Sequence, residues 1–395
     1  MYIFRSITFM KLAIKRVEFL KILNFANQII PAKSPESQFM NFLLRCNEEG
    51  LSVIASDGTI STKIEQPLKN SQGEDIIFNI NPGFIQVPAK YFLDIISKIG
   101  GDMVTIEMVD STMLNISDGI NNFNLKTKAG EEYPDVNLAI PENNNGLSVQ
   151  LADFKKLFDA TSFAAATRGP KELFQGINIR AHDGKLYFLA TDSYRMARYA
   201  VPLEDSQAQI DFTCPVKALD MVSKISEEGS CTIYFDEQSA LFVSNGITLS
   251  TRLIRGEFPS ADRIIPASFE YTCKMNTSEF LNAADLIKVV TSYENKNNQV
   301  KLILSKDTGV TLTAKSTNYG DGKTVLRESE ISLPEGQSIF EIGFNLEYAV
   351  AAVKALNSQS FTFEFVSPTR MFMLKNDDPE NIQIVTPIRM NSFEN

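Results

Sequence analysis

Side chains suited to catalysis are sparse in this sequence. His182 is the only histidine, so acid–base and metal chemistry that depends on imidazole lacks its usual residue. The four cysteines are far apart and form no CxxC pair, which indicates buried free thiols and not a zinc or redox site. The sequence therefore predicts no metal site and no cofactor.

Two short stretches offer an enzymatic alternative. NYGDGKTVL, which begins at Asn318, ends like a phosphate-binding loop, but Thr317 stands where that motif requires its first glycine. Alternating stretches on both sides predict a hairpin turn at this place. Asp192 in ATDS has no accompanying base, nucleophile or metal ligand, so we expect it to cap a turn. An enzyme remains the main alternative class at this point.

Two predicted helices carry a similar column of charges along one face. The column consists of Lys90, Asp94 and Lys98 in one helix and Lys217, Asp220 and Lys224 in the other. On a single helix, a solvated face with weak ion pairs explains such a column. The six predicted helices together are nearly neutral, whereas the whole chain has a formal net charge of -10. This contrast suits a protein that guides a polyanion along one surface without gripping it.

The charged helices belong to a repeated unit. VPAKYFLDIISKIGGDMVTIEM from Val87 is echoed by CPVKALDMVSKISEEGSCTIYF from Cys214, and Pro88 matches Pro215. A third, fainter copy begins at Phe344. Each copy shows a helix, a polar turn and an alternating strand.

Each copy also has an upstream partner in which a strand leads into a helix. Phe19, Phe154 and Phe280 occupy equivalent positions early in these helices. The chain is therefore predicted to contain three repeats of about 126 residues, too long for a solenoid unit and suited to similar domains. Short alternating strands between turns predict antiparallel sheets with helices on one face, an α+β fold. The expected domains are residues 10–140, 146–266 and 267–395, with a polar linker between the first two.

Four stretches resemble one known family. FLATDSYRMARY at Phe188, LIRGEFPSADRIIP at Leu253, EIGFNLEYAVAAVKAL at Glu341 and the near-terminal IVTPIRM are similar to motifs of the bacterial replicative sliding clamp, the beta subunit of DNA polymerase III. The resemblance implies three clamp domains per chain and a head-to-tail homodimeric ring around duplex DNA. It implies a non-catalytic processivity subunit that holds DNA without regard to sequence. A ring built from repeated wedges needs only one interface geometry that closes on rotation.

The resemblance also implies a peptide-binding cleft between the second and third domains. Its partners would be the alpha subunit of the replicative polymerase, the clamp loader and other proteins with clamp-binding motifs. Methionines that can repack around different guests suit such a cleft. The implied cleft residues are Phe174, Thr191, Ser193, Tyr194, Arg195, Met196, Pro259, Arg263, Ile264, Asn345, Tyr348, Thr369, Met371, Pro387, Ile388, Arg389 and Met390.

Two further sets of residues are expected to contact DNA and to form the interface with a second chain. The charge columns assign DNA contacts to Lys90, Lys98, Lys217 and Lys224, and the resemblance adds the loop residues Lys33, Ser34, Arg168 and Lys171. The resemblance places Phe123 and Leu125 on an edge strand that meets the third domain of a second chain. The expected contacts of that third domain are Val289 and Val290.

One departure concerns the cleft, because Ser193-Tyr194 replaces the Gly-His more common in the family and predicts a bulkier rim. No apolar stretch reaches the roughly 18 residues of a membrane-spanning helix, so we expect a cytoplasmic protein without a membrane partner. A protein-interaction scaffold that does not contact DNA is the second alternative class.

Overall fold

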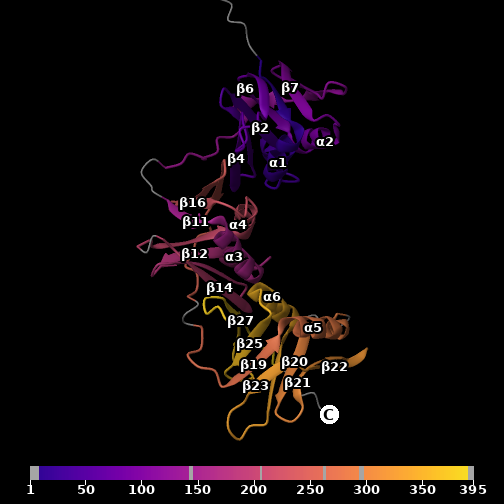
Figure 1. Cartoon of the computed structure of the whole chain (residues 1–395), viewed down its shortest axis with the longest axis vertical. Coiled ribbons are helices and arrows are strands. Elements are labelled where there is room, and N and C mark those ends of the chain that lie inside the picture. The colour runs from indigo at the N-terminus through magenta and orange to yellow at the C-terminus, as the bar shows by residue number, and fades with distance from the viewer. Residues whose placement is uncertain (1–8, 142–145, 205–206, 261–263, 293–297, 390–395) are drawn as a thin grey trace, which may run out of the picture. The chain divides into compact units, whose positions relative to one another are not determined.

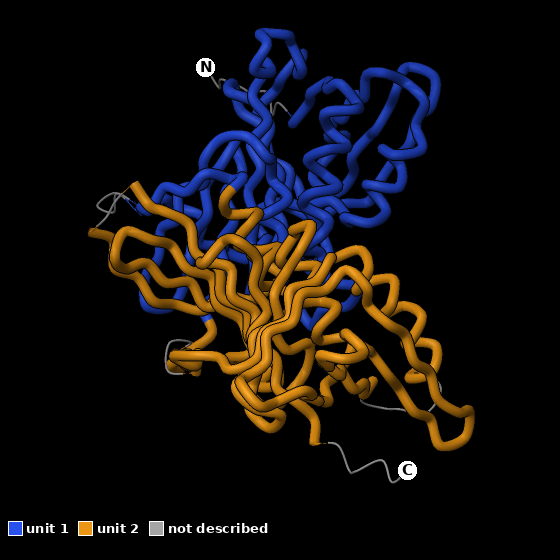
Figure 2. Tube along the Cα trace, turned by 60° about the horizontal axis from the view of Figure 1, so that its bottom comes forward, with its two compact units in different colours: residues 1–152, 220–253 blue, residues 153–219, 254–395 orange. Residues whose placement is uncertain are grey.

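The computed structural model describes residues 9–141, 146–204, 207–260, 264–292 and 298–389. The chain divides into two compact units (Figure 2), of which the first holds residues 1–152 and 220–253 and the second holds residues 153–219 and 254–395. All strand pairs described in either unit are antiparallel, which confirms the predicted α+β class. Most of the predicted linker, residues 142–145, lies outside the described residues.

The elements follow the chain in three similar series (Figure 1). The first contains β1 (Lys11–Lys15), α1 (Arg16–Asn27), η1 (Ser37–Met40), β2 (Asn41–Asn47), β3 (Gly50–Ser56), β4 (Ile60–Pro67), β5 (Ile77–Asn81), β6 (Gly83–Pro88), α2 (Ala89–Lys98), β7 (Met103–Asp110), β8 (Met113–Ser117), β9 (Asn122–Lys126), β10 (Lys128–Ala129) and η2 (Gly130–Glu132). The second contains β11 (Leu147–Gln150), α3 (Leu151–Thr161), η3 (Ser162–Ala164), η4 (Glu172–Gln175), β12 (Gly176–His182), β13 (Lys185–Thr191), β14 (Arg195–Pro202), β15 (Ile210–Pro215), α4 (Val216–Ser223), β16 (Ser230–Phe235), β17 (Ser239–Ser244) and β18 (Ile247–Arg252). The third contains β19 (Tyr271–Asn276), α5 (Thr277–Thr291), β20 (Gln299–Ser305), β21 (Gly309–Ser316), β22 (Gly320–Leu326), β23 (Ser329–Ser332), β24 (Ile339–Asn345), α6 (Leu346–Leu356), β25 (Ser360–Phe365), β26 (Phe372–Lys375) and β27 (Ile382–Val385).

Strand pairing joins each series to the next. In the first unit β4 pairs with β18, which gives a nine-stranded sheet in the order β10-β6-β2-β3-β4-β18-β17-β16-β11. In the second unit β14 pairs with β27 in a nine-stranded sheet of the order β15-β12-β13-β14-β27-β26-β25-β19-β23. The first series also forms a five-stranded sheet, β5-β1-β7-β8-β9, and the third a four-stranded sheet, β22-β21-β20-β24. Strands β9 and β22 therefore end their sheets.

The strand registers confirm the repeat found in the sequence. Pro88 pairs with Asn41, and its counterpart Pro215 pairs with Gly176, in both cases at the last residue before a helix. This common register makes Arg45 on β2 and Arg180 on β12 equivalent. The repeat is thus present in the backbone pairing as well as in the sequence.

The three predicted phenylalanines anchor the first helix of each series. Phe19, Phe154 and Phe280 are all fully buried. Phe19 meets Phe92 of α2 edge to face, with ring centroids 5.7 Å apart, and Phe154 meets Phe188 of β13 at 5.2 Å. Such aromatic pairs add to the large apolar area that each ring buries. The helices are held on their sheets mainly by this packing.

The second helix of the first series shows how the charge column arises. Phe92, Ile95 and Ile96 face the interior, so helical periodicity places Lys90, Asp94 and Lys98 on the exposed face of α2. A buried apolar stripe and an outward charged stripe are both consequences of one amphipathic sequence.

Two predictions about local chemistry are confirmed. The stretch from Asn318 begins in the turn at residues 317–319 and continues as β22, which pairs with β21, so it belongs to a hairpin and not to a strand-to-helix phosphate loop. All four cysteines are free and buried. Burial raises the pKa of Cys46 to about 11 and those of Cys231 and Cys273 to about 12. These thiols remain protonated near neutral pH and are therefore weak nucleophiles.

We predict that Phe280→Ala lowers the free energy of unfolding of the second unit by about 3–5 kcal/mol, because it empties a fully buried aromatic site. Phe280 lies 5.3 Å from Phe361 and 5.7 Å from Phe363, ring centroid to centroid, so several partners lose contact. Urea denaturation measures the change, and the exposed Val109→Ala serves as the control. An equal effect of both substitutions would contradict the described packing.

Candidate functional site

The second unit contains a compact cluster of apolar side chains outside its main core. We call it the Met196 cluster, and its buried members are Phe174, Leu189, Met196, Phe258, Met373, Ile382 and Ile384. Partly buried side chains pack against it, namely Ala166, Leu173, Ile264, Ile265, Phe269 and Met371. A set that mixes buried and half-exposed apolar groups is able to bind an apolar ligand.

The pairing of β14 with β27 positions this cluster. Met196 lies directly opposite Ile384 in that pair, and Ile384 lies opposite Met373 of β26. Successive side chains of a strand point to opposite faces, so Ile382 and Ile384 fall on the same face. Phe174 from η4 meets Phe258 edge to face, with centroids 5.9 Å apart. Side chains from two different repeats therefore form one surface.

A tight turn between β13 and β14 lies beside the cluster. Asp192 accepts hydrogen bonds from the amides of Tyr194 and Arg195 at 2.9 and 3.0 Å, which confirms its predicted turn-capping role. Its other carboxylate oxygen lies 2.9 Å from Nε of Arg195. Thr191 donates its hydroxyl to the carbonyl of Arg195 at 2.7 Å. These bonds fix the side chain of Arg195 relative to the strand.

Ser193 occupies the apex of this turn with a φ of 80°. This is left-handed backbone, which favours glycine and which other residues adopt only at some cost. The position is the one where glycine is more common in the family that the sequence resembles. The serine thus retains a glycine-like conformation.

Aromatic rings surround the guanidinium of Arg195. Its central carbon lies 4.6 Å from the ring centroid of Tyr348 and 5.4 Å from that of Phe163. Tyr194 is 62% exposed and stacks near Tyr348, with centroids 6.5 Å apart. Burial, aided by the carboxylate of Asp192, raises the pKa of the Tyr348 phenol. Two tyrosine rings and an ion-paired arginine form a flat, partly exposed rim.

The start of α6 and the end of the chain adjoin this rim. Asn345 caps α6 by accepting hydrogen bonds from the amides of Glu347 and Tyr348. Thr386 donates both its amide and its hydroxyl to the carbonyl of Tyr194, each at 2.9 Å. Pro387 bridges to Phe344, and Ile388 donates its amide to Gly343 at 2.8 Å. The last described strand is therefore tied to the turn that holds Arg195.

The structure brings together most, but not all, of the residues that the resemblance implied for peptide binding. Phe174, Met196, Ile264 and Met371 belong to the Met196 cluster. The residues of the Arg195 rim are Thr191, Ser193, Tyr194, Arg195, Asn345, Tyr348, Pro387 and Ile388. Pro259, Thr369 and Arg389 are not members of the Met196 cluster, and no hydrogen bond or ion pair of their side chains with either group is found among the described residues. Arg263 and Met390 lie outside the described residues.

Sequence reasoning missed five of the buried members, Leu189, Phe258, Met373, Ile382 and Ile384, and four of the partly buried ones, Ala166, Leu173, Ile265 and Phe269. The alternation of Ile382 and Ile384 predicts a shared face, but only the pairing of β14 with β27 shows which residues lie opposite them. That pairing joins positions almost two hundred residues apart in the sequence. The local spacing of apolar residues does not predict this pairing.

The cationic residues expected to contact DNA are exposed at their predicted elements. Lys90 and Lys98 lie on the outer face of α2, and neither forms an ion pair with a described residue. Lys224 lies 2.6 Å from Asp220, so its charge is partly compensated. Lys217 is exposed on α4.

The expected loop contacts are also at the surface. Lys33 and Arg168 are exposed, and Ser34 accepts a hydrogen bond from the amide of Glu36 at 3.2 Å. The ammonium of Lys171 lies over the ring of Phe174, 5.0 Å from its centroid.

The two open sheet edges carry exposed apolar side chains. Phe123 on β9 is 41% exposed, whereas Leu125 on the same strand is buried within its own sheet. Beside β22, Val289 of α5 is 62% exposed and Val290 is half-buried. Leu286, one helical turn before Val290, is also exposed and was missed from the sequence.

The described residues contain no group of three or more His, Cys, Asp or Glu that could hold a metal ion. Among the described helices, none has the length and apolarity to cross a bilayer.

Comparison with known proteins identifies relatives of the whole chain. Family models of the DNA polymerase III beta subunit match residues 10–138 as the N-terminal domain, 148–260 as the central domain and 262–389 as the C-terminal domain. Beta sliding clamps of Staphylococcus epidermidis and Staphylococcus aureus are each 29% identical over 385 residues, which cover 96% of this chain and 99% of theirs.

Solved structures agree with these sequence matches. The DNA polymerase III beta chain of Streptococcus pneumoniae is 25% identical with a TM-score of 0.89, over 96% of this chain and 100% of that one. The Bacillus subtilis sliding clamp, at 24% identity, also has a TM-score of 0.89, with 97% and 100% covered.

Three repeated clamp domains with continuous sheets across their junctions define a processivity clamp, a non-catalytic accessory protein of a DNA polymerase. The chain belongs to the family of DNA polymerase III beta subunits, the beta sliding clamps. Its function in DNA replication requires DNA and a polymerase as partners.

We predict that Asp192→Ala lowers the free energy of unfolding of the second unit by about 1–3 kcal/mol, because two turn amides and the Arg195 guanidinium lose their acceptor. Asp192→Asn should cost less, since its side-chain oxygen can still accept from both amides. Denaturant titration of the two variants measures the difference. Equal losses would show that the amide bonds contribute little.

Proposed function

We propose that two copies of this chain close into a head-to-tail ring by pairing β9 of one subunit with β22 of the other. The support is the repeat itself. The pairs β4·β18 and β14·β27 join successive domains within the chain. In each pair, one strand belongs to a domain and the other is the last strand of the domain that follows it. Strand β22 corresponds to β4 and β14, and β9 corresponds to β18 and β27. The two open edges are thus the two halves of a third junction.

The strand counts agree with this proposal. Each junction within the chain produces a nine-stranded sheet, whereas the sheets that end in β9 and β22 have five and four strands. Pairing β9 with β22 would make a third sheet of the same size. Unpaired edges expose backbone donors and acceptors, so a dedicated partner edge also limits aggregation.

The registers of the existing junctions predict that of the new one. Ala55, Ala190 and Ala314 are equivalent in the three repeats, and they pair with Thr62, Ala197 and Gly322. Across the junctions, Thr62 faces Leu249, and Ala197 faces Gln383. The corresponding residue on β9 is Phe123, which would face Gly322 of the partner subunit.

Burial gives independent support for this register. Leu249 and Gln383 are fully buried, whereas their counterpart Phe123 is 41% exposed. Such a difference is expected of a strand whose neighbour belongs to another chain. Val290 covers Gly322, since a Cβ there would lie only 2.8 Å from its Cγ2, so Phe123 opposite Gly322 would be placed near Val290.

Inside this ring, we propose that the exposed lysines of the helices attract duplex DNA weakly. Lys90 and Lys98 present uncompensated charge, and Lys217, Lys224, Lys33, Ser34, Arg168 and Lys171 are the further candidates. Contacts to phosphates alone carry no sequence information. A few of them guide the duplex and still allow the protein to slide.

We further propose that the Met196 cluster and the Arg195 rim bind clamp-binding peptides of the polymerase alpha subunit, the clamp loader and other partners. The cluster supplies apolar surface with several methionines, which adapt to different guests. The rim supplies a fixed arginine and two tyrosines for orientation. Pro259, Arg263, Thr369, Arg389 and Met390 remain candidates for the margin of this surface.

The proposed ring leads to a prediction about the oligomeric state. Phe123→Asp should convert a dimer into a monomer, because a charge would be buried against Gly322 and Val290 of the partner subunit. Sedimentation equilibrium at micromolar concentration measures the mass. Phe78→Asp is the matched control, since Phe78 is 38% exposed on β5, at the opposite edge of the same sheet. A wild-type monomer, or a Phe123→Asp dimer, would contradict the proposed interface.

The proposed peptide site leads to a prediction about binding affinity. Met196→Ala should weaken the binding of a polymerase-derived clamp-binding peptide by about 1–3 kcal/mol through lost apolar contact, and Met390→Ala should act in the same direction. Calorimetric titration measures both affinities. Met40→Ala, an exposed methionine of the first unit, is the control. Unchanged affinity in the Met196 variant would place the peptide elsewhere.

A further inference from the structure

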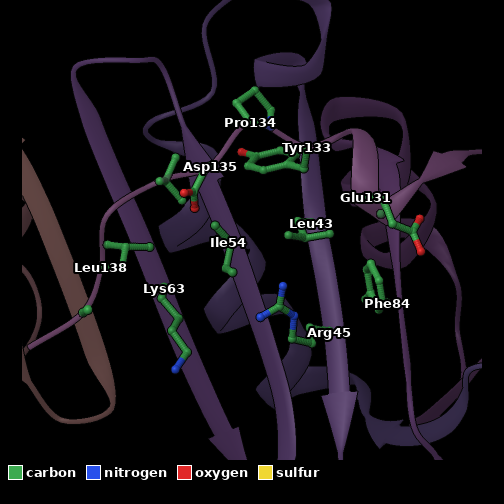
Figure 3. A pocket seen from close by; sticks show the side chains of 13 residues that line it. Leu43, Arg45, Ile54, Lys63, Phe84, Glu131, Tyr133, Pro134, Asp135 and Leu138 are labelled. Carbon is green, nitrogen blue, oxygen red and sulfur yellow. The ribbon is translucent and has the colours of Figure 1, made fainter.

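The first clamp domain contains a pocket that the proposed function does not use (Figure 3). It has a volume of about 390 Å³, which is within the range of small-ligand and peptide-anchor sites. Leu43 of β2 and Ile54 of β3 form its apolar floor, and Tyr133 forms a wall with Val136 and Leu138. Arg45 and Lys63 line the end away from Tyr133 and Pro134.

This pocket occupies the place in the first domain where Phe174 and Phe258 of the Met196 cluster lie in the second. In the first domain Tyr133 meets Phe39 edge to face at 6.4 Å, and in the second Phe258 meets Phe174 at 5.9 Å. The chain after Gly130 therefore covers its sheet as the chain after Gly256 does. The arginines that lie beneath these covers differ in their partners.

Arg180 has two partners in the second domain. It donates from Nη2 to the carbonyl of Phe258 at 2.9 Å, and its Nε lies 3.1 Å from a carboxylate oxygen of Asp211. These contacts fasten the covering segment to the sheet. They also neutralise the arginine.

Its equivalent Arg45 is free of such contacts. Phe84 occupies the position opposite Arg45 that Asp211 occupies opposite Arg180. The guanidinium of Arg45 lies over that ring, 5.6 Å from the centroid, and has no hydrogen-bond or ion-pair partner among the described residues. An arginine stacked on a ring keeps its N–H edges available, and those edges match a carboxylate in two-point geometry.

The covering segment offers free backbone groups as well. Residues 135–138 are in no helix or strand, and within the described chain their amides donate no hydrogen bond. An extended peptide can pair with such groups in the manner of an added strand. Leu43 and Arg45 are two residues apart on one face of β2, about 7 Å. Side chains at positions i and i+2 of an extended peptide have the same spacing.

We propose that this pocket binds a short, extended acidic peptide of a partner protein, with an apolar side chain over Leu43 and Ile54 and a carboxylate on Arg45. Lys63 at the same end is compensated by Glu65 at 2.5 Å, and Glu131 and Asp135 also line the pocket. The preference for a carboxylate therefore rests on the guanidinium of Arg45, which is unpaired among the described residues. The site is separate from the Met196 cluster and does not depend on ring closure. It gives the clamp a second kind of docking motif, in which the acidic residue follows the apolar one by two positions.

Ligand-observed saturation-transfer NMR on the full-length protein tests this. The probe is the peptide acetyl-Ser-Ile-Ser-Asp-Ser-amide, and the matched peptide has Asn in place of Asp. We expect a dissociation constant of about 1 mM for the Asp peptide and binding at least about tenfold weaker for the Asn peptide. Arg45→Met should remove this preference, and Arg45→Lys should retain part of it.

Three controls make the outcome decisive. Arg252→Met removes an exposed arginine of the same unit and should leave binding unchanged. Met196→Ala should also leave it unchanged, whereas a loss would assign the peptide to the Met196 cluster and overturn the proposal. Thermal melting shows whether each variant is folded. Equal affinity for the two peptides, no binding in the millimolar range, or a preference that survives Arg45→Met would each overturn the proposal.

Discussion

The arrangement of the domains depends on hydrogen bonding between the edge strands of their sheets. An antiparallel sheet that ends in an open strand exposes a row of backbone donors and acceptors, and proteins cover or pair such rows. In this chain the last strand of one domain completes the sheet of the domain before it, at β4·β18 and again at β14·β27. In the proposed ring the same device is used once more between chains, and β9 and β22 would then have no open edge.

The two junctions within the chain have the same backbone and different side chains. Ser61 and Ser250 lie opposite each other at the first junction, where the second has Met196 and Ile384. The proposed apolar docking surface therefore belongs to the second junction. In the first domain the corresponding sheet has a pocket whose Arg45 stacks on Phe84 and has no ion-pair partner among the described residues. The repeat thus keeps the backbone pairing while the side chains of the two junctions differ.

Much of the fold could be predicted from the sequence because its signals are local. The buried phenylalanines of the three first helices, the turn capped by Asp192, the hairpin after Asn318 and the buried thiols all follow from spacing and residue type. The family resemblance supplied the residues of the candidate site as a set. The peptide-binding, DNA-binding and dimer assignments stay predictions.

What could not be predicted depends on distant pairing. No periodicity shows that Ile384 lies opposite Met196, or that Arg45 stacks on Phe84 while Arg180 binds Asp211. Leu125 illustrates the same limit, since its strand was expected at an edge but its side chain packs inward. These features are set by register between strands, and register is a property of the folded sheet.

Retention on DNA of different topology tests the central claim most directly. After loading onto closed circular DNA by its clamp loader, the protein should remain bound through gel filtration, and linearising the circle should release it within the time needed to slide to an end. Phe123→Asp should not be retained on either form. Equal retention on circular and linear DNA would show that affinity, and not a closed ring, holds the protein on the duplex.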